Sequence, residues 1–264
     1  LAGRLLDASG APVAGRTVMT SADGTLDAPP RSRWISAPTD ERGEFRLVDV
    51  RPGRNELYLS GATPAEMIWA ASVEVPDQAL TEREIVLGGA TLRGRLLRGP
   101  GETPLARGLV VAVRRAPEGE RFHGRVLADD DGAYHFEQLE PGVYDIAAYA
   151  TDGELGQEQR EVLVGATNVE GVDFVLLPGG RLELSVRGAD GEPVAAELDF
   201  FDERGARVRF SGQDRAGADG RYLVRGIRAG AWSVVARAEG WREARRTAVV
   251  GAGRSVQLEI RLER

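Results

Sequence analysis

The 264-residue chain contains no cysteine and no lysine, so all 34 positively charged side chains are arginines. Without cysteine there is no disulfide, no thiolate metal ligand and no cysteine nucleophile. Without lysine the chain forms no Schiff base and has neither a phosphate-loop lysine nor a Ser–Lys dyad. Such a strong preference for arginine over lysine suggests a GC-rich genome.

Histidine is scarce as well, because only His123 and His135 are present. A Ser–His–Asp triad needs a histidine beside a buried carboxylate and a serine in an elbow-like turn, yet no G-x-S-x-G occurs. Catalytic zinc normally takes three protein ligands, and no H-E-x-x-H pair is present. His135 alternates with two aromatic residues and is expected to face solvent, whereas His123 is expected in a polar, arginine-flanked loop. We therefore expect no enzymatic activity and no cofactor.

Long apolar runs are also missing, so the sequence predicts no membrane span. The net charge is −7 at pH 7. Acidic residues outnumber arginines in residues 1–89 (13 against 9) and 90–178 (15 against 9), but not in residues 179–264 (13 against 16). This acidic balance, without a dense arginine stripe interleaved with aromatics, argues against nucleic-acid binding.

What the chain does contain is an internal repeat. Residues 129–149 read DDDGAYHFEQLEPGVYDIAAY, in which turn residues separate two segments of alternating apolar residues. This pattern is typical of two strands joined by a tight turn. It occurs three times, and its first glycines, Gly43, Gly132 and Gly220, are 132 − 43 = 89 and 220 − 132 = 88 residues apart. The spacing predicts three units, here called the first, second and third repeat.

Each repeat has about seven short strand-like segments, with turn signals every eight to twelve residues, which is typical of a two-sheet sandwich. A sustained 3.6-residue period is absent, so little helix is expected. We expect an all-β chain of three tandem seven-stranded Greek-key sandwiches at residues 1–88, 89–178 and 179–264. Glycines and a proline at the boundaries leave almost no linker, which predicts a semi-rigid rod.

Four segments recur in order within the repeats: an opening strand, a Pro-Val step, an Asp-Gly-aromatic turn and a Pro-Gly-x-Tyr turn. The opening strand reads Gly3-Arg4-Leu5 and Gly94-Arg95-Leu96, with Glu183-Leu184-Ser185 as the third counterpart, and the Pro-Val step reads Pro12-Val13, Pro104-Leu105 and Pro193-Val194. The Asp-Gly-aromatic turns contain Gly43, Gly132 and Gly220. The last turn reads Pro141-Gly142-Val143-Tyr144 in the second repeat, and the other two repeats have Asn55 and Trp232 at the tyrosine position. With these segments the repeats resemble the carboxypeptidase regulatory-like family.

This resemblance implies a transthyretin-like, Ig-like sandwich in each repeat, and a spacer, stabiliser or interaction module. The peptidase activity of proteins that carry such domains resides in a separate domain. A related group, the collagen-adhesin B-type repeats, is strengthened by isopeptide bonds from lysine. Because this chain has no lysine, it cannot form those bonds.

The aspartates Asp129, Asp130 and Asp131 form the best candidate for a metal site. Calcium takes six to eight oxygen ligands, and loop sites usually space their carboxylates two apart. Asp129 and Asp131 are therefore the pair that could converge. The alternative is a solvated turn in which an aspartate caps its own backbone.

The tryptophans are the candidates for ligand binding. Trp34 stands in a Pro/Arg/Ser-rich loop with Arg31 and Arg33, in which a short strand could form around Trp34 to Ser36. An exposed aromatic there could stack on a sugar or anchor a peptide, and the alternative is that Trp34 folds back over the open end of its own repeat. Trp241 follows a glycine in a turn where the aromatic side chain usually packs on the sandwich edge. Trp232 is expected in the core, and Trp69 half-buried in a strand.

The leading hypothesis is a non-enzymatic structural or interaction module, a spacer or scaffold segment of a larger envelope or secreted protein. Its partners would be other protein domains or cell-surface components. The resemblance implies an extracytoplasmic location: periplasmic, cell-surface or secreted. The alternative is a carbohydrate- or peptide-binding module that uses the loop aromatics around Trp34.

Overall fold

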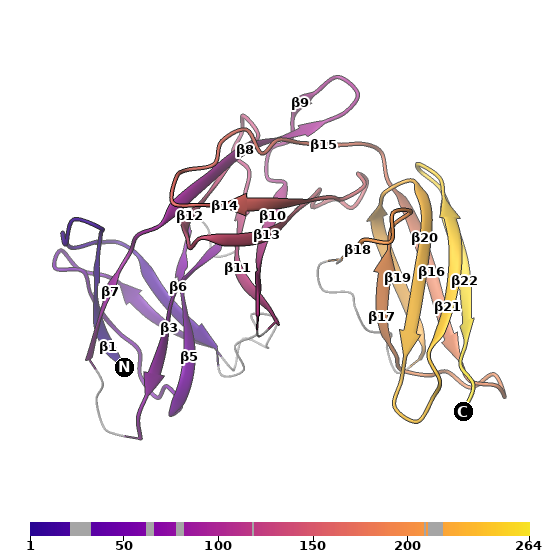
Figure 1. The fold of residues 1–264 in the computed structure, drawn as a ribbon, viewed down its shortest axis with the longest axis horizontal. Coiled ribbons are helices and arrows are strands. Elements are labelled where there is room, and N and C mark those ends of the chain that lie inside the picture. Colours follow the sequence, from indigo (N-terminus) through magenta and orange to yellow (C-terminus); the bar gives the residue numbers. More distant parts are fainter. Residues whose placement is uncertain (22–32, 62–65, 78–81, 118, 209, 211–218) are drawn as a thin grey trace. The chain divides into compact units, whose positions relative to one another are not determined.

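The computed structural model describes residues 1–21, 33–61, 66–77, 82–117, 119–208, 210 and 219–264 (Figure 1). Every regular element in these residues is a β-strand, and no helix occurs among them. The expected all-β fold is therefore confirmed. Side-chain alternation accounts for the strands: in β16 (Gly180–Arg187), buried residues alternate with more exposed ones. This is the pattern of a strand with one face in a core.

A group of three paired strands recurs three times. Its central strand pairs antiparallel with the first strand of the core hairpin and parallel with the last strand of the repeat. These sheets are β1 (Ala2–Leu6) between β4 (Glu44–Arg46) and β7 (Glu82–Val86); β8 (Ala90–Arg98) between β12 (Ala133–Leu139) and β15 (Phe174–Leu176), with β9 (Thr103–Pro104) also on β8; and β16 between β19 (Arg221–Ile227) and β22 (Ser255–Arg261).

A group of four strands recurs as well, built around the second strand of each hairpin. In strand order the groups are β6 (Met67–Val75), β5 (Gly53–Ser60), β2 (Thr17–Ser21) and β3 (Arg33–Pro38); β14 (Glu158–Val164), β13 (Gly142–Tyr149), β10 (Leu109–Ala116) and β11 (Gly119–Leu127); and β21 (Ala244–Val250), β20 (Gly230–Arg237), β17 (Glu197–Phe201) and β18 (Arg207–Val208). Seven strands of each repeat are thus arranged in the same way.

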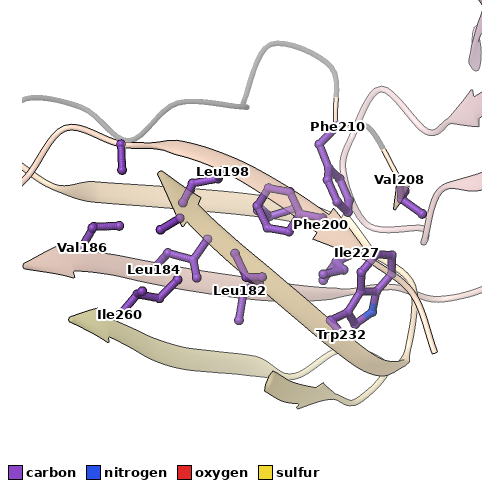
Figure 2. Close-up of a cluster of buried hydrophobic side chains, with 14 of the residues drawn as sticks. Leu182, Leu184, Val186, Leu198, Phe200, Val208, Phe210, Ile227, Trp232 and Ile260 are labelled. Atoms are coloured by element: carbon purple, nitrogen blue, oxygen red, sulfur yellow. The ribbon is translucent and has the colours of Figure 1, made fainter. Parts of the chain in front are cut away.

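The core of the third repeat lies between its two sheets (Figure 2). Leu182 and Leu184 come from the three-stranded sheet, whereas Phe200 and Trp232 come from the four-stranded sheet. A second cluster joins the two sheets of the first repeat in the same manner. Each buried aliphatic or aromatic side chain contributes about 1.5–3 kcal/mol through its removal from water. These shared clusters make the paired sheets sandwiches.

The repeated hairpin glycines have a conformational reason. Gly43, Gly132 and Gly220 have φ angles of 74°, 73° and 67°, in the left-handed region that side chains with a Cβ rarely adopt. A Cβ on Gly220 would also lie 2.4 Å from the carbonyl oxygen of Val186 in the neighbouring strand. Both the turn and the close approach of β16 therefore require glycine.

Gly220→Ala is accordingly expected to destabilise the third repeat more than Gly191→Ala. Gly191 has a φ of 84°, but no atom lies within 4 Å of its Cβ position. The left-handed conformation alone costs about 1–2 kcal/mol, and the clash with Val186 should add about 1–3 kcal/mol. Urea unfolding of both variants measures the difference. Equal losses would mean that the close approach contributes nothing.

Three different side chains make one recurring hydrogen bond in the second hairpin strand. Asn55 Nδ2, Tyr144 Oη and Trp232 Nε1 each donate to the carbonyl oxygen four residues earlier, at 3.0, 3.0 and 2.8 Å. All three residues are buried, as expected for Trp232. Because each bond ties the turn to its own strand, the donor position matters more than the residue type.

The main-chain bonds of the Pro-Val step correct one sequence alignment. The N–H groups of Val13, Leu105 and Val194 donate to the carbonyl oxygens of Leu5, Leu96 and Val186 at 2.9–3.0 Å. The third counterpart of Gly-Arg-Leu is therefore Leu184-Ser185-Val186, and the predicted match to Glu183-Leu184-Ser185 is wrong by one residue. A one-residue shift would place exposed side chains in the core, whereas the corrected match keeps Val186 buried like Leu5.

The chain divides into two compact units, and the second repeat contributes to both. One unit contains Leu1–Arg95, Leu109–Ala147 and Arg160–Asp173, and the other contains Leu96–Gly108, Ala148–Gln159 and Phe174–Arg264. Within the latter, the N–H of Gln157 donates to the carbonyl oxygen of Gly226 at 2.9 Å, which joins the second repeat to the third. The predicted boundaries at 1–88, 89–178 and 179–264 stay a prediction.

Candidate functional site at the junction of the first two repeats

The first two repeats share one sheet. Strand β6 of the first repeat pairs antiparallel with β11 of the second, with Ile68 opposite Gly124 and Met67 opposite Arg125. The resulting order is β14-β13-β10-β11-β6-β5-β2-β3. Two four-stranded groups thus form a single eight-stranded sheet. We call the contacts around the β6–β11 pairing the junction.

Gly124 permits this close approach. A Cβ at residue 124 would lie 2.6 Å from the carbonyl oxygen of Met67, so only glycine fits without a shift of the main chain. Beside it, Oε1 of Glu66 accepts the N–H of Leu127 at 3.1 Å. The Glu66 side chain therefore extends the pairing between the repeats beyond Met67, the first residue of β6.

A buried cluster supports the junction on one face of the sheet. It comprises Met19, Tyr58, Met67 and Trp69 from the first repeat, with Phe122 from β11 packed against them. The rings of Tyr58 and Phe122 are tilted, with centroids 6.0 Å apart. The apolar area removed from water there stabilises the shared sheet beyond its main-chain bonds.

Polar side chains at the edge of this cluster are hydrogen-bonded to one another. Trp69 Nε1 donates to Oε2 of Glu56 at 2.7 Å, and Ser72 Oγ donates to the same oxygen at 2.6 Å. The guanidinium of Arg121 from β11 lies 5.7 Å from the Trp69 ring centroid, within the range of a cation–π contact. Trp69 is 9% exposed, and so is more buried than the half-buried strand residue predicted.

His123 lies inside the junction, and its predicted loop position is wrong. It belongs to β11 and is 3% exposed, because the rings of Trp69, Phe136 and Tyr144 surround it. Nε2 lies 3.0 Å from the carbonyl oxygen of Glu137, so the neutral ring donates there. Burial is the main reason why the pKa of His123 is lowered to about 4. The imidazole is therefore neutral at pH 7.

A triad of ionisable side chains crosses the junction beside a cleft of about 450 Å³. Glu137 lies 3.6 Å from Arg16 of the first repeat and 3.4 Å from His135 of the second. The His135 side chain is 59% exposed, which confirms that it faces solvent. The hydrogen bond to Glu137 raises the pKa of His135, and the bond from His135 lowers the pKa of Glu137.

The predicted metal residues lie in a capped turn. Oδ1 of Asp129 accepts the N–H groups of Asp131 at 3.0 Å and Ala133 at 2.8 Å. Asp40 makes the equivalent bonds in the first repeat, which indicates a recurring turn geometry. Among the described residues, no three His, Asp or Glu side chains are grouped as a metal ion would require. Calcium binding by Asp129 and Asp131 stays a prediction.

The predicted ligand-binding residues lie in separate parts of the sequence. Trp241 is partly buried at the edge of the third-repeat core, and the guanidinium of Arg264 lies 5.0 Å from its ring centroid. The main chain of Trp34 pairs with Thr20 within β3 and β2. Arg31 and the side chains of Arg33 and Trp34 fall outside the described residues. Ligand binding by these four residues therefore stays a prediction.

Within the described ranges, no helix has the length and apolar character needed to cross a membrane. Comparison with known protein families and with curated proteins gave no match.

Among solved structures, the chain is similar to the TIE protein of Bacillus anthracis, with 14% identity and a TM-score of 0.31. That match covers 100% of this chain, which spans 50% of the TIE protein. It is similar to a streptococcal ancillary pilin at 12% identity and a TM-score of 0.29, covering 99% and 98% of the two chains. It is also similar to BcpA, the major pilin subunit of Bacillus cereus, at 13% identity and a TM-score of 0.29, covering 100% and 98%.

Proposed function

We propose that the chain is a non-enzymatic structural module, a spacer or scaffold whose repeats are joined by built contacts. The observation that carries this proposal is the eight-stranded sheet that runs through the first two repeats. A shared sheet resists bending and pulling in a way that a flexible linker does not, because its hydrogen bonds must break before the repeats can separate. Such a pair holds its ends at a fixed separation.

Contacts between the second and third repeats also support the proposal. Besides the bond from Gln157 to Gly226, Glu158 lies 3.6 Å from Arg228, which also pairs with Asp202 at 3.3 Å. These contacts lie within the second compact unit. The middle repeat thus has specific polar contacts with the third repeat in addition to its sheet with the first.

Single-molecule pulling from Leu1 and Arg264 tests the spacer function. Independent repeats of about 88 residues would release roughly 300 Å each at 3.3–3.6 Å per residue. If the first two repeats act as one mechanical unit, we expect a single step of about 600 Å for the pair. Three separate steps of about 300 Å at similar force would contradict the proposal, because they would show three independent beads.

The narrower family, location and partners belong to the same proposal. We infer membership of the carboxypeptidase regulatory-like family from the repeated segments, and with it an extracytoplasmic location and partners among protein domains or cell-surface components. A binding screen against glycans and short peptides, with Trp34→Ala as the paired variant, tests the alternative. Saturable binding that Trp34→Ala abolishes would replace the spacer with a ligand-binding module.

A further inference from the structure

The junction places an ionisable ring between the two repeats. The centroid of His123 lies 6.4 Å from that of Trp69 in the first repeat and 5.6 Å from that of Tyr144 in the second. Directly after His123 come Gly124 and Arg125, the two residues of β11 whose pairing with β6 is described. A positive charge on this ring would therefore be buried at the junction.

We propose that the junction is acid-sensitive: protonation of His123 separates β11 from β6 while the two sandwich cores stay folded. The proposal rests on the spacer function and deepens it, since acid would turn a rigid pair of repeats into a hinged pair. Opening lets water reach the imidazolium, which removes the cost of keeping its charge buried.

The carbonyl oxygen of Glu137 favours a positive charge on His123, but the charged side chains nearest the ring do not. Arg114 of β10 disfavours the charged ring, and Arg121 and Arg125 flank it on its own strand. On the side of β6, the nearest ring is Trp69, whose Nε1 already donates to the carboxylate of Glu56.

Strand β12 presents Glu137, but with its carbonyl oxygen rather than its carboxylate. That carbonyl accepts from Nε2 of His123, while the carboxylate pairs with Arg16 and His135. From the segment before β6, Glu66 is bonded to the main chain of Leu127. The carboxylates of Glu137 and Glu66 therefore already have other hydrogen-bond or ion-pair partners.

The direction of the pH effect follows from the two states. The ring binds a proton near its ordinary pKa of 6.5 when the junction is open, and only near 4 when it is closed. The open state therefore binds more protons between these values, and closure weakens as the pH falls from about 6.5 to about 4. Between about pH 7.5 and about pH 5, the ratio of closed to open junctions should fall about 30-fold.

Titration of His135 and Glu137 changes the stability differently from titration of His123. The pKa of His135 is raised by its hydrogen bond to Glu137 in the same strand, so this pair stabilises the second repeat itself below about pH 6.5, and its contribution is lost as the pH rises through the folded value. Because this side chain is 59% exposed, solvent screens the pair and its effect is smaller than that of His123. The pKa of Glu137 is lowered, so its contribution is lost only at lower pH.

Hydrogen exchange of the full chain at about pH 7.5 and about pH 5, corrected for intrinsic rates, tests the proposal. We expect the protection of the Met67 and Arg125 amides, which face each other across the junction, to fall about 30-fold at the lower pH, while Leu57 and Ile146 in the cores keep theirs. In His123→Gln, which retains a neutral donor, protection at the junction should not depend on pH in this range. His135→Gln is the matched control and should behave like the natural chain.

Equal junction protection at both pH values would overturn the proposal, as would an unchanged pH effect in His123→Gln. A uniform loss across junction and cores would overturn it too, since that is global acid unfolding. Should His123→Gln fail to fold, ring titration by NMR decides: His123 must titrate well below 6.5, and a normal pKa contradicts the switch. Pulling near pH 7.5 tests the spacer separately, so the two proposals can fail independently.

Discussion

Gly124→Ala is expected to weaken the junction and to lower the free energy of unfolding by about 1–3 kcal/mol. The added Cβ would lie 2.6 Å from the carbonyl oxygen of Met67 and 3.1 Å from the Cα of Ile68. Both are main-chain atoms within a sheet, so they cannot swing aside like the end of a long side chain. In urea, the midpoint should fall, and the slope should decrease because the two repeats no longer unfold together.

Gly165→Ala is the matched control for this variant. Residue 165 is exposed, and no atom lies within 4 Å of its Cβ position. Its substitution should change the free energy of unfolding by no more than about 0.5 kcal/mol. Indistinguishable urea curves for the two alanine variants would show that the β6–β11 approach is not needed for stability.

Trp232→Ala should have the largest effect on the third repeat, a loss of about 3–5 kcal/mol in the free energy of unfolding. The side chain is 2% exposed, and its ring lies 5.6 Å from that of Phe210 in the core (Figure 2). Its removal leaves a cavity and also breaks the bond from Nε1 to the carbonyl oxygen of Arg228. Urea unfolding followed by circular dichroism measures the loss.

Two further variants separate packing from hydrogen bonding. Trp232→Phe keeps a ring but loses the donor, and should cost less than Trp232→Ala. Trp241→Ala removes a tryptophan that only borders the core and should cost about 1 kcal/mol. A Trp232→Ala loss as small as that of Trp241→Ala would contradict the core position of Trp232.

The repeat and its strands were predictable because their signals are local. Gly43, Gly132 and Gly220 mark turns that need a left-handed residue, and side-chain alternation reports which face of a strand is buried. The core position of Trp232 followed from the same pattern. The one-residue error in the third opening strand arose because Leu184 stands where the other two repeats have Gly3 and Gly94, so the local marker of register is missing.

The junction was not predicted because it depends on which strand edges meet in three dimensions. His123 looked like a loop residue because Arg121 and Arg125 flank it. All three residues belong to strand β11, however, and the His123 side chain is buried. Gly124 inside a strand was the available signal, since an interior glycine often marks a close main-chain approach. The apolar run that begins at Met67 supplied the other half of the contact.

The absence of cysteine allows a direct test of the shared sheet. Met67 and Arg125 are opposite each other in the β6–β11 register, and opposed residues hold their Cα atoms about 4.5–5.5 Å apart, within the separation that a disulfide bridges. The double variant Met67→Cys/Arg125→Cys should therefore form an intramolecular disulfide readily on mild oxidation.

Met67→Cys/Glu161→Cys is the control, because β14 lies four strands from β6 in the sheet, or roughly 19 Å. Mass spectrometry of the oxidised monomers measures the cross-linked fraction. The shared sheet predicts nearly complete cross-linking of the 67/125 pair and little of the 67/161 pair. Equally low cross-linking of both pairs in folded protein would contradict the junction.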